Sequence, residues 1–598
     1  MTGSSTTSPR SPARRTTAVV VVGLLAALAA ALALVCAPPA GATATTTMVM
    51  EGRGWGHGIG MSQYGADGYA LHHWKYAAII EHYYTGVTLG KVKNVPIRVL
   101  LRSGTASATV TDAARFNATW TAGGKVKTVH LAARATATVT WSGGAYHLRA
   151  GAGSWSAGTP ITFVPLTSRL KLLTANDNGH VGHYRGRLRI VHLSDGLEIV
   201  NTLPLETYLY GVVPCESPAS WPAEALKAQA VAARSYAYRR TGRGGSFDVY
   251  CTTASQYYGG ADSETVATDK AVNSTKGIVP KYKGTPIVAY FFSTSGGHTE
   301  NIENVWTGAS PVPYLKGVPD PYDTTSPYHV WPNNPIRRTP AQLAAAMGFA
   351  KGPLRAVYVV KRGTSPRVVK ALLIGDKGWA VTNGASLRAD LGLRDAWVYF
   401  TSLSIARSAT SVTYGQAVTL SGRRYPQLAA TRTIALHSRL IGGSWSSRRA
   451  TAKAGSSTID GYAVKFTGFS AKVVPTGNTQ YYFSAPAAMG AYAISAHVVV
   501  DVRLAVTIQP ASETVASGAQ VVFSGVVTPA AAAKSVFLQT KSGSSWTKIA
   551  SATPRSDGSY TFTWTATGTT TLRVLALPAS TRFVPGASLP VTLTVASS

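Results

Sequence analysis

Acidic residues and cysteines are both scarce in this sequence. It holds 25 Asp and Glu residues against 57 Lys and Arg residues, and its three cysteines allow one disulfide at most. No P-loop and no dinucleotide-binding fingerprint occurs, so the common nucleotide-binding folds are not indicated. Only 14% of the residues are charged, whereas 45% are hydrophobic, which is typical of folded domains. A chain of 598 residues is too long for one core, so we expect several domains.

The excess of positive charge, formally +32, indicates an affinity for polyanions. If such a chain were exported from a bacterium, the nearest polyanions would be anionic wall polymers and phospholipid headgroups. Nucleic acid is the rival partner, but the sequence has no basic helix, zinc finger or RNA-binding motif, and its basic residues are scattered. We therefore expect no nucleic-acid partner. The alternative is that the charge serves solubility alone.

The first 44 residues have the composition of a secretory signal. Arg10, Arg14 and Arg15 precede an apolar run at residues 18–37, and the small residues Ala42-Thr43-Ala44 follow. This order predicts cleavage after Ala44 and a secreted, wall-associated protein. Because a run of about 20 residues can span a bilayer, an uncleaved membrane anchor is the alternative. Cleavage removes three basic residues and no acidic one, so residues 45–598 keep a charge of 32 − 3 = +29.

Residues 204–240 contain the strongest catalytic candidate. An apolar, β-prone stretch ends in the turn Pro-Cys-Glu-Ser-Pro, and an Ala-rich helix follows directly. Glu216 is therefore expected at a rigid strand-to-helix junction, between Pro214 and Pro218 and close to Trp221. A carboxyl group in such a place is a candidate general acid. The alternatives are a solvated loop glutamate and a helix-capping carboxylate.

Five sequence blocks together resemble the SpoIID/LytB family, the stage II sporulation protein D and amidase-enhancer proteins. The resemblance covers roughly residues 48–400. The blocks are residues 204–240, GRGWGHGIGMSQYGADGYA at 52–70, YRGRL at 184–188, residues 248–259, and STSGGHTENIENVW at 293–306.

This resemblance implies a peptidoglycan lytic transglycosylase that uses no cofactor. The essential glutamate of SpoIID-type enzymes matches Glu216, which would protonate the glycosidic oxygen between N-acetylmuramic acid and N-acetylglucosamine. The same carboxylate would then take the proton of the C6 hydroxyl, leaving a 1,6-anhydromuramoyl end. The LytB side of the family implies instead a non-catalytic enhancer that binds an N-acetylmuramoyl-L-alanine amidase. A third possibility is a wall-binding protein whose domain has lost activity.

Further residues are expected to bind substrate in the cleft. Arg234 has an alternative role as partner of a buried carboxylate, and Glu300 is a reserve acid. Glu206 is expected on the strand before the turn, and Glu224 in the first turn of the following helix, where a carboxylate favours the helix dipole. The expected substrate-binding residues are His57, Ser62, Gln63, Gln229, Arg234, Tyr236, Gln256, Ser295 and Glu300.

Cys215 and Cys251 are the two cysteines that remain after signal cleavage. An exported compartment permits a disulfide between them. Members of the resembled family often carry a further cysteine where this chain has Ser255. That difference argues against zinc, and no H-E-x-x-H motif is present, so we expect a Cys215–Cys251 bridge and no metal site.

Hydrophobic patterning places the remaining elements. Alternating residues over 95–200 predict an antiparallel β region, and helices are expected at 61–84, 222–240 and 264–276. Residues 286–293 read as a buried strand, and 311–340 as an extended loop. Beyond residue 400, TYGQAVTLSG at 413–422 is repeated as ASGAQVVFSG at 516–525. This repeat predicts two β-sandwiches, which serve as wall-binding modules or as spacers.

The expected fold is therefore multidomain. An α+β SpoIID-type catalytic domain spans residues 45–400 and contains the inserted β region at about 95–200. Two all-β immunoglobulin-like sandwiches follow at 401–500 and 501–598. The expected partners are peptidoglycan glycan strands, anionic wall polymers and an amidase.

Overall fold

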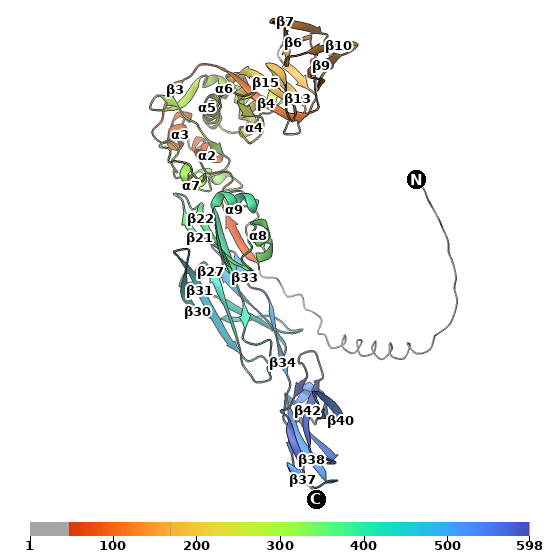
Figure 1. Cartoon of the computed structure of the whole chain (residues 1–598). Helices are drawn as coiled ribbons and strands as arrows, with labels where there is room; N and C mark the ends of the chain where they lie inside the picture. The colour runs from red at the N-terminus through yellow and green to blue at the C-terminus, as the bar shows by residue number, and fades with distance from the viewer. Residues whose placement is uncertain (1–46, 168, 597–598) are drawn as a thin grey trace, which may run out of the picture.

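The computed structural model describes residues 47–167 and 169–596. The described part is multidomain, rich in strands and elongated, with an inserted β region at one end and the C-terminal strands at the other (Figure 1). The predicted signal peptide lies outside the described residues. In the described part, no helix is both long enough and apolar enough to cross a membrane.

A helical unit stands next to the inserted β region. Helix α5 is its centre, since α2, α3, α4 and α6 all pack against it. Most of its side chains are buried and many are alanines, which allows the neighbouring helices to approach closely. The helices of this unit are α2 (Gln63–Leu71), α3 (Tyr76–Tyr83), α4 (Leu205–Glu216), α5 (Ala223–Tyr238), α6 (Val266–Ser274) and α7 (Ile302–Val305).

The sequence patterns predicted most of these helices, but not all of the residues at which they begin and end. The helix expected at 61–84 is two helices, because residues 72–75 break it and His73 has a positive φ of 67°. The strand expected at 286–293 is wrong as a continuous element, since only its two ends are paired. The short strands of this unit are β2 (Met61–Ser62), β3 (Thr88–Lys91), β16 (Val249–Tyr250), β17 (Ile278–Tyr282), β18 (Thr285–Pro286) and β19 (Phe291–Phe292).

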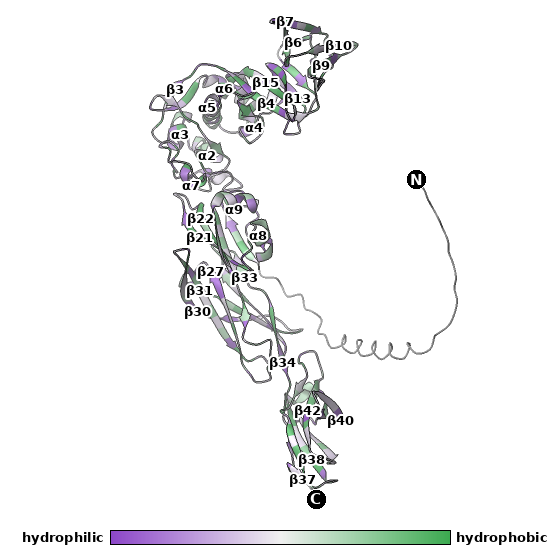
Figure 2. Ribbon diagram, viewed as in Figure 1, coloured by the Kyte–Doolittle hydropathy of each residue, from purple (hydrophilic) through white to green (hydrophobic). Residues whose placement is uncertain are grey.

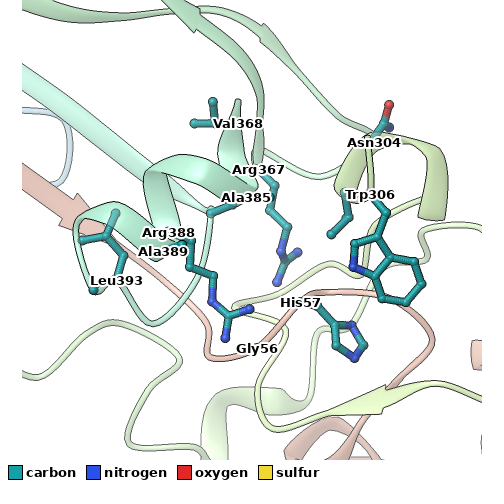
Figure 3. Close-up of a pocket in the computed structure, with 13 residues that line it drawn as sticks. Gly56, His57, Asn304, Trp306, Arg367, Val368, Ala385, Arg388, Ala389 and Leu393 are labelled. Carbon is teal, nitrogen blue, oxygen red and sulfur yellow. The ribbon is translucent and has the colours of Figure 1, made fainter. Parts of the chain in front are cut away.

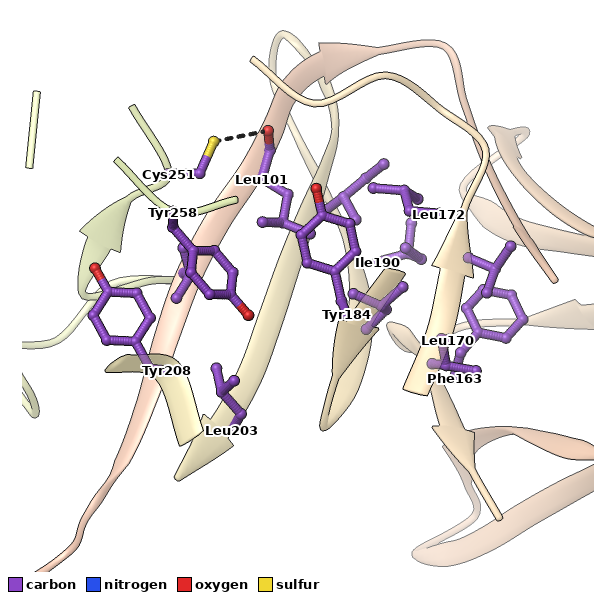
Figure 4. Packing of buried hydrophobic residues seen from close by; sticks show 14 of the residues in the cluster. Leu101, Phe163, Leu170, Leu172, Tyr184, Ile190, Leu203, Tyr208, Cys251 and Tyr258 are labelled. Carbon is purple, nitrogen blue, oxygen red and sulfur yellow. Dashed lines mark hydrogen bonds between the residues drawn. The ribbon is translucent and has the colours of Figure 1, made fainter. Parts of the chain in front are cut away.

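The antiparallel region expected at 95–200 is confirmed and consists of two sheets around one core. Figure 4 shows part of this core, where Tyr208 of α4 packs beside residues of the sheets. Its strands are β4 (Pro96–Thr105), β5 (Ser107–Thr111), β6 (Phe116–Ala122), β7 (Lys125–Leu131), β8 (Ala137–Ser142), β9 (Ala145–Ala150), β10 (Gly153–Ala157), β11 (Ile161–Pro165), β12 (Arg169–Leu172), β13 (Gly182–Arg185), β14 (Arg187–Leu193) and β15 (Gly196–Pro204).

A middle unit connects the helices to the C-terminal strands. Its β1 pairs with β20 and β24, and β24 also pairs with β27, so one sheet crosses residue 400. A three-stranded sheet and two helices complete it. Its elements are β1 (Met48–Gly52), η2 (Asp323–Thr325), β20 (Ile336–Arg338), α8 (Pro340–Ala346), β21 (Leu354–Arg362), β22 (Val368–Gly375), β23 (Gly378–Thr382), α9 (Gly384–Asp390) and β24 (Val398–Leu403).

Two strand-rich units form the C-terminal third, and each encloses its own core between two sheets. Apolar and polar residues alternate along their strands (Figure 2). The first has β25 (Ala406–Arg407), β26 (Ser411–Thr413), β27 (Val418–Tyr425), β28 (Ala435–Leu440), β29 (Ser446–Arg449), β30 (Thr451–Ile459), β31 (Tyr462–Val473), β32 (Thr479–Pro486), β33 (Tyr492–Ile494) and β34 (Val498–Arg503). The second has β35 (Ala505–Val506), β36 (Gln509–Pro510), β37 (Thr514–Val515), β38 (Gln520–Thr528), β39 (Ala533–Ser542), β40 (Ser545–Ala552), β41 (Ser559–Thr565), β42 (Thr570–Pro578), β43 (Gly586–Ala587) and β44 (Val591–Val595).

The two C-terminal units share a packing detail at the repeated glycine. A Cβ on Gly422 would lie 2.2 Å from the carbonyl oxygen of Ser404, and one on Gly525 would lie 2.1 Å from that of Thr507. In both units a neighbouring backbone carbonyl therefore lies so close to the glycine that no residue with a Cβ fits. The sequence repeat corresponds to a repeat of local structure.

Candidate functional site

Glu216 is the last residue of helix α4, not part of a strand-to-helix turn. The expectation of a β-prone run before it is wrong, because residues 205–216 are helical. Pro218 explains why the helix stops there: a residue before proline avoids the helical conformation, and Ser217 is extended with φ −141° and ψ 132°. Glu216 is thus fixed at the helix C-terminus, where the helix dipole disfavours a negative charge.

The Glu216 carboxylate has two hydrogen-bond donors from distant segments. Gln63 Nε2 donates to Oε2 at 3.0 Å, and the backbone N–H of Tyr257 donates to Oε1 at 2.8 Å. Desolvation by burial raises the pKa of Glu216, and the two hydrogen bonds oppose that rise only in part. A carboxyl group with a raised pKa holds its proton closer to neutral pH, as a general acid must.

The loop that carries Tyr257 is anchored on both sides. The buried amide of Gln256 accepts from Tyr208 Oη and donates to the carbonyl of Ala233, both at 3.3 Å. Tyr258 Oη donates to Asn201 Oδ1 at 2.9 Å. These anchors direct the N–H of Tyr257 at Glu216 and leave its side chain 36% exposed. Gln256 therefore holds the loop that carries Tyr257 in place. Its own side chain is too buried to contact substrate, which corrects its predicted role.

Aromatic rings lie beside Glu216. Tyr64, the residue after Gln63, packs against Trp221 in an edge-to-face contact at 5.1 Å. Trp221 follows Glu216 closely in sequence, on the segment between α4 and α5. Together with the exposed Tyr257 they provide apolar surface on which sugar rings can stack. Of these three, Tyr64 and Tyr257 were not predicted; their positions directly after Gln63 and Gln256 were the available signal.

The other nearby carboxylates are already paired. Glu206 lies in the first turn of α4, not on a strand, and receives Arg234 Nε at 2.9 Å and Nη2 at 2.8 Å. Arg234 is fully buried and pairs with the buried Glu206, which is the alternative that the sequence left open for it, and not the expected contact with substrate. Glu224 lies in the first turn of α5 and accepts from Tyr76 N–H and Lys227 Nζ.

Glu300 and Ser295 are enclosed as well. The Glu300 carboxylate is fully buried and accepts backbone N–H groups of Thr364 and Ser365 at 2.9 and 3.0 Å. Ser295 Oγ donates to Asp323 Oδ2 at 2.8 Å, inside the same fold interior. Both residues join chain segments to one another, and neither reaches a ligand from these positions. Their expected substrate contacts are corrected accordingly.

Three further residues that were predicted to bind substrate are buried: two contact other parts of the protein, and the side-chain amide of the third has no hydrogen-bond partner among the described residues. Ser62 is fully buried and caps α2, since its Oγ accepts from the N–H of Gly65 at 3.1 Å. Tyr236 is buried on α5 with the Arg240 guanidinium 3.5 Å from its ring centre. Gln229 is buried on the same helix, and neither atom of its side-chain amide has a partner among the described residues.

His57 lies apart from Glu216, at a cavity of about 400 Å³ (Figure 3) whose lining does not include the glutamate. Its Nδ1 accepts from the N–H of Ile59 at 3.0 Å. Burial first, and then the positive charges of Arg388 and Arg367, lower the pKa of His57 to about 3. The imidazole is therefore neutral at physiological pH. Of the predicted substrate-binding residues, all of which lie in the described part of the chain, only Gln63 has a side-chain hydrogen bond to Glu216.

The predicted disulfide is absent, since Cys215 and Cys251 are both free. Cys251 is buried in the β core, where its thiol donates to the carbonyl of Leu101 at 3.4 Å (Figure 4). Cys215 lies at the end of α4, and a Cβ on Gly259 would come within 2.8 Å of its sulfur. Burial raises the pKa of Cys251 to about 11 and also raises that of Cys215, which favours the protonated thiol over the nucleophilic thiolate at both positions. Within residues 47–167 and 169–596, no cluster of His, Cys, Asp or Glu is arranged to hold a metal ion.

The chain carries a SpoIID domain. Residues 194–282, which include Glu216, match the family model SpoIID, described as stage II sporulation protein. Stage II sporulation protein D of Bacillus subtilis is 34% identical over 214 residues, which are 33% of this chain and 60% of that protein. The amidase enhancer of the same species is 50% identical over 115 residues, 19% of this chain and 15% of the enhancer. An uncharacterised protein of Brachyspira hyodysenteriae is 43% identical over 138 residues, 23% of this chain and 37% of that protein.

These matches confirm the resemblance on which the sequence analysis rested: residues 194–282 match the SpoIID model, and the chain is similar to proteins named stage II sporulation protein D and amidase enhancer. It spans between 15% and 60% of the length of these relatives.

Proposed function

We propose that this protein acts on the bacterial cell wall as a peptidoglycan lytic transglycosylase, with Glu216 as its single acid and base. The observation that carries the proposal is the hydrogen-bonded carboxyl of Glu216, whose pKa is raised by burial at the end of α4. The SpoIID match and the relatives named for sporulation and amidase enhancement support a wall-related role.

The paired carboxylates favour a one-carboxyl mechanism. Hydrolytic glycosidases use a second carboxylate as nucleophile or base. Here Glu206 and Glu224 are bound to cationic partners, and Glu300 is enclosed by backbone donors. With these three described carboxylates engaged, we expect the nucleophile to come from the substrate.

In the proposed reaction, protonated Glu216 gives its proton to the oxygen that leaves with N-acetylglucosamine, and the bond from that oxygen to C1 of N-acetylmuramic acid breaks. The C6 hydroxyl of the same sugar attacks C1, and its proton passes to the Glu216 carboxylate. The acid is regenerated and no water is consumed. Gln63 and the Tyr257 N–H stabilise the carboxylate that exists between the two proton transfers.

The test is to incubate the full secreted chain with peptidoglycan, both intact and stripped of its peptides, and to analyse the soluble products by mass spectrometry. We expect 1,6-anhydromuramoyl ends from the wild type and none from Glu216→Gln. Glu224→Gln is the matched control, because this partly exposed carboxylate lies on the next helix and should leave the products unchanged. Reducing ends in place of anhydro ends would show hydrolysis and remove the proposed mechanism.

A non-catalytic amidase enhancer is the second candidate, favoured by the 50% identity to a protein of that name. In that case the chain would bind an N-acetylmuramoyl-L-alanine amidase and accelerate it. The distinguishing experiment adds wild type and Glu216→Gln to an amidase acting on wall sacculi. Equal stimulation by both proteins, with no anhydro ends from either, supports the enhancer.

We also propose that residues 401–500 and 501–598 are immunoglobulin-like sandwiches that hold a secreted protein on anionic wall polymers. Their separate cores and repeated glycine contacts support two similar modules. Because β24 crosses residue 400 and pairs with β1, a chain cut at residue 400 would lose part of this strand. The shortened chain for the test therefore lacks only residues 504–598, which leaves β24 intact. The shortened chain should sediment with sacculi less than the full chain does. Added salt should reduce the sedimentation of both chains, since charges are screened within about 8 Å at physiological ionic strength. Equal sedimentation of the two would make the second module a spacer.

A further inference from the structure

The first C-terminal unit holds an arginine between a tryptophan ring and a glutamine amide. The Cζ atom of Arg439, on β28, lies 4.7 Å from the ring centre of Trp445, which directly precedes β29. The Nε atom of Arg439 donates to Gln480 Oε1 at 2.9 Å. Gln480 is the residue opposite Arg439 on the neighbouring strand β32. The hydrogen bond and the ring together fix the plane of this guanidinium group.

The second C-terminal unit contains the same group with two strands exchanged. Arg573 Cζ lies 4.2 Å from the ring centre of Trp546, and Arg573 Nε donates to Gln539 Oε1 at 2.8 Å. The two sheets have the same strand order, β26-β34-β32-β28-β29 and β37-β44-β42-β39-β40, so β28 corresponds to β39 and β32 to β42. The arginine nevertheless lies on β28 in the first unit and on β42 in the second, each time opposite the glutamine. A copied sequence segment does not produce this exchange, so the arrangement itself recurs.

Both groups lie on the outer face of their sheets. Leu436 of β28 and Tyr481 of β32 belong to the core of the first unit, and Leu538 of β39 and Leu572 of β42 to that of the second. Because side chains alternate between the two faces of a strand, the arginine and the glutamine of each unit point away from that core. Both arginines are partly exposed, and Trp445 is 37% exposed. A ligand can therefore reach both groups.

Neither arginine has an acidic partner. Residues 401–598 hold 17 Lys and Arg residues against four Asp and Glu residues, and one of these four, Asp460, pairs with Lys370 at 3.3 Å. Within the part of the chain that the structure describes, no carboxylate forms an ion pair with Arg439 or Arg573. Their side-chain hydrogen bonds go through Nε, and their Nη atoms have no acceptor among the described residues. Each guanidinium group thus presents two free donor nitrogens in a fixed plane.

A guanidinium group of this kind suits an oxyanion. Arginine binds phosphates with two parallel hydrogen bonds, and such charge-assisted bonds are about twice as strong as neutral ones. A group that is fixed in advance also loses less entropy on binding. Two such groups in tandem suit a polymer with a repeated anion, because the first contact raises the local concentration for the second.

The aromatic rings leave little open surface for a base or a sugar. The arginine covers one face of the tryptophan in each unit. In the first unit Trp445 also meets Tyr482 edge to face at 4.8 Å, and Tyr482 is itself stacked between His437 and His497, at 4.3 and 4.6 Å. Nucleobases need open aromatic faces on which to stack. These rings instead position the arginine, so a phosphate chain without rings fits better than a nucleic acid.

We propose that Arg439 and Arg573 bind phosphodiester groups of a wall polymer whose backbone is a polyol phosphate. The assignment rests on the proposed role of the two units in holding the protein on anionic wall polymers, and it names the anion and the residues that contact it. Each unit contributes one receptor. The excess positive charge of residues 401–598 attracts the polymer, and the two fixed guanidinium groups bind its phosphates.

The test is calorimetric titration of the full secreted chain with soluble poly(glycerol phosphate) at fixed ionic strength. Arg439→Gln and Arg573→Gln should each weaken binding by about 10-fold, the loss of one charge-assisted contact, and the double variant should bind more weakly than either. Arg423→Gln and Arg555→Gln are the matched controls, because each removes the same charge from an exposed position of one unit. These controls should change the affinity by no more than about two-fold, since exposed charges are screened by salt.

A second pair of variants separates geometry from charge. Arg439→Lys and Arg573→Lys keep the charge but lose the planar fork, so each should still bind more weakly than the wild type while its melting temperature stays unchanged. Wild-type affinity in all four variants of these two arginines, or equal losses in the controls, would overturn the proposal.

Two further polymers test the chemistry of the anion. Tighter binding of single-stranded DNA than of poly(glycerol phosphate) would assign the receptors to nucleic acid, and equal binding of polygalacturonate would reduce them to a general attraction for polyanions. Either result contradicts the proposal. The titration contains no sacculi, so a chain that sediments with the wall but does not bind the soluble polymer would refute these receptors and leave the wall-holding role intact.

Discussion

Gln63 Nε2 lies 3.0 Å from Glu216 Oε2, although 153 positions separate the two residues in sequence. Gln63 is the first residue of α2, and Glu216 is the last residue of α4. The contact brings the N-terminal glycine-rich block to the carboxyl group that we propose as the acid. It also makes the protonation of Glu216 sensitive to a residue outside the segment matched by the SpoIID model.

Replacement of Glu216 by glutamine should reduce glycan cleavage by roughly 10²–10⁴-fold, the usual contribution of general acid–base catalysis. Glutamine has the same size, its single amide oxygen accepts one of the two hydrogen bonds, and its NH2 group can donate to the Gln63 amide oxygen once that amide rotates. The melting temperature should therefore stay within a few degrees of the wild type. Product release from stripped glycan strands measures the rate, and calorimetry measures the melting temperature. A large fall in stability with residual cleavage would assign Glu216 a structural role instead.

Replacement of Gln63 by alanine should shift the pH dependence of cleavage. The Gln63 hydrogen bond stabilises the carboxylate and thus lowers the pKa of Glu216, against the larger effect of burial. Without this bond the pKa rises further, so the protonated acid persists and the alkaline limb of the profile moves to higher pH. Tyr64→Phe is the control, because Tyr64 packs beside the site without contacting the carboxylate. Identical profiles for all three proteins would contradict the coupling.

Replacement of Arg234 by methionine should destabilise the fold by about 3–5 kcal/mol, because Glu206 would remain buried without its cation. Lys227→Met, on the same helix, is the control. It removes a half-exposed pair with Glu224, and such pairs contribute at most about 1 kcal/mol. Denaturant unfolding of both variants measures the difference. Similar losses in the two would show that the Arg234 pair contributes no more than a surface ion pair.

Asp320 should make the stability of the protein decrease as pH rises toward neutrality. Burial, followed by the charge of Asp323, raises its pKa to about 7. Between pH ~4 and ~7 the unfolded chain releases this proton while the folded chain keeps it, so the free energy of unfolding falls across that window. Asp320→Asn should flatten this slope, whereas Asp376→Asn, at an exposed carboxylate, should leave it in place. An unchanged slope in Asp320→Asn would mean that the carboxyl titrates normally.

Both cysteines of the secreted chain should react as free thiols once the protein is unfolded. Alkylation in denaturant without reductant should add two labels, counted by mass spectrometry. In the native protein Cys251 should resist labelling, because it is fully buried and its pKa is about 11. A chain that takes up no label until reductant is added would restore the disulfide that the structure lacks.

Local sequence determined several elements directly. The Ala-rich segment predicted α5, because alanine favours helix and its neighbours lack breakers. Alternating patterns predicted the antiparallel region at 95–200, because a half-buried strand repeats with period two. The family motifs located Glu216. The C-terminal repeat was also visible, since a glycine that no other residue can replace recurs at Gly422 and Gly525.

Helix α4 shows where local reasoning failed. Read one by one, Val212 and Val213 favour a strand, and Pro214 disfavours the interior of a helix. The buried side chains of this segment nevertheless recur at helical spacing, and that signal could have predicted the helix. They are Leu205, Tyr208, Leu209, Val212 and Val213. Packing of this face against the β core outweighs the small intrinsic preference for strand.

Which polar residues face a ligand was decided only by the tertiary structure. Gln63, Gln256, Arg234 and Glu300 were all expected in the cleft, with pairing to a buried carboxylate as the alternative for Arg234. In the structure Gln63 bonds Glu216, while the other three stabilise the interior. A buried charge needs a partner, and the fold determines which residue is close enough to provide it. Spacing along the chain does not predict that Arg234 pairs with Glu206. It also does not predict that Arg367 and Arg388 line the same cavity. The sequence by itself determined the family resemblance and the candidate acid; long-range packing decided the burial and the hydrogen bonds of that candidate.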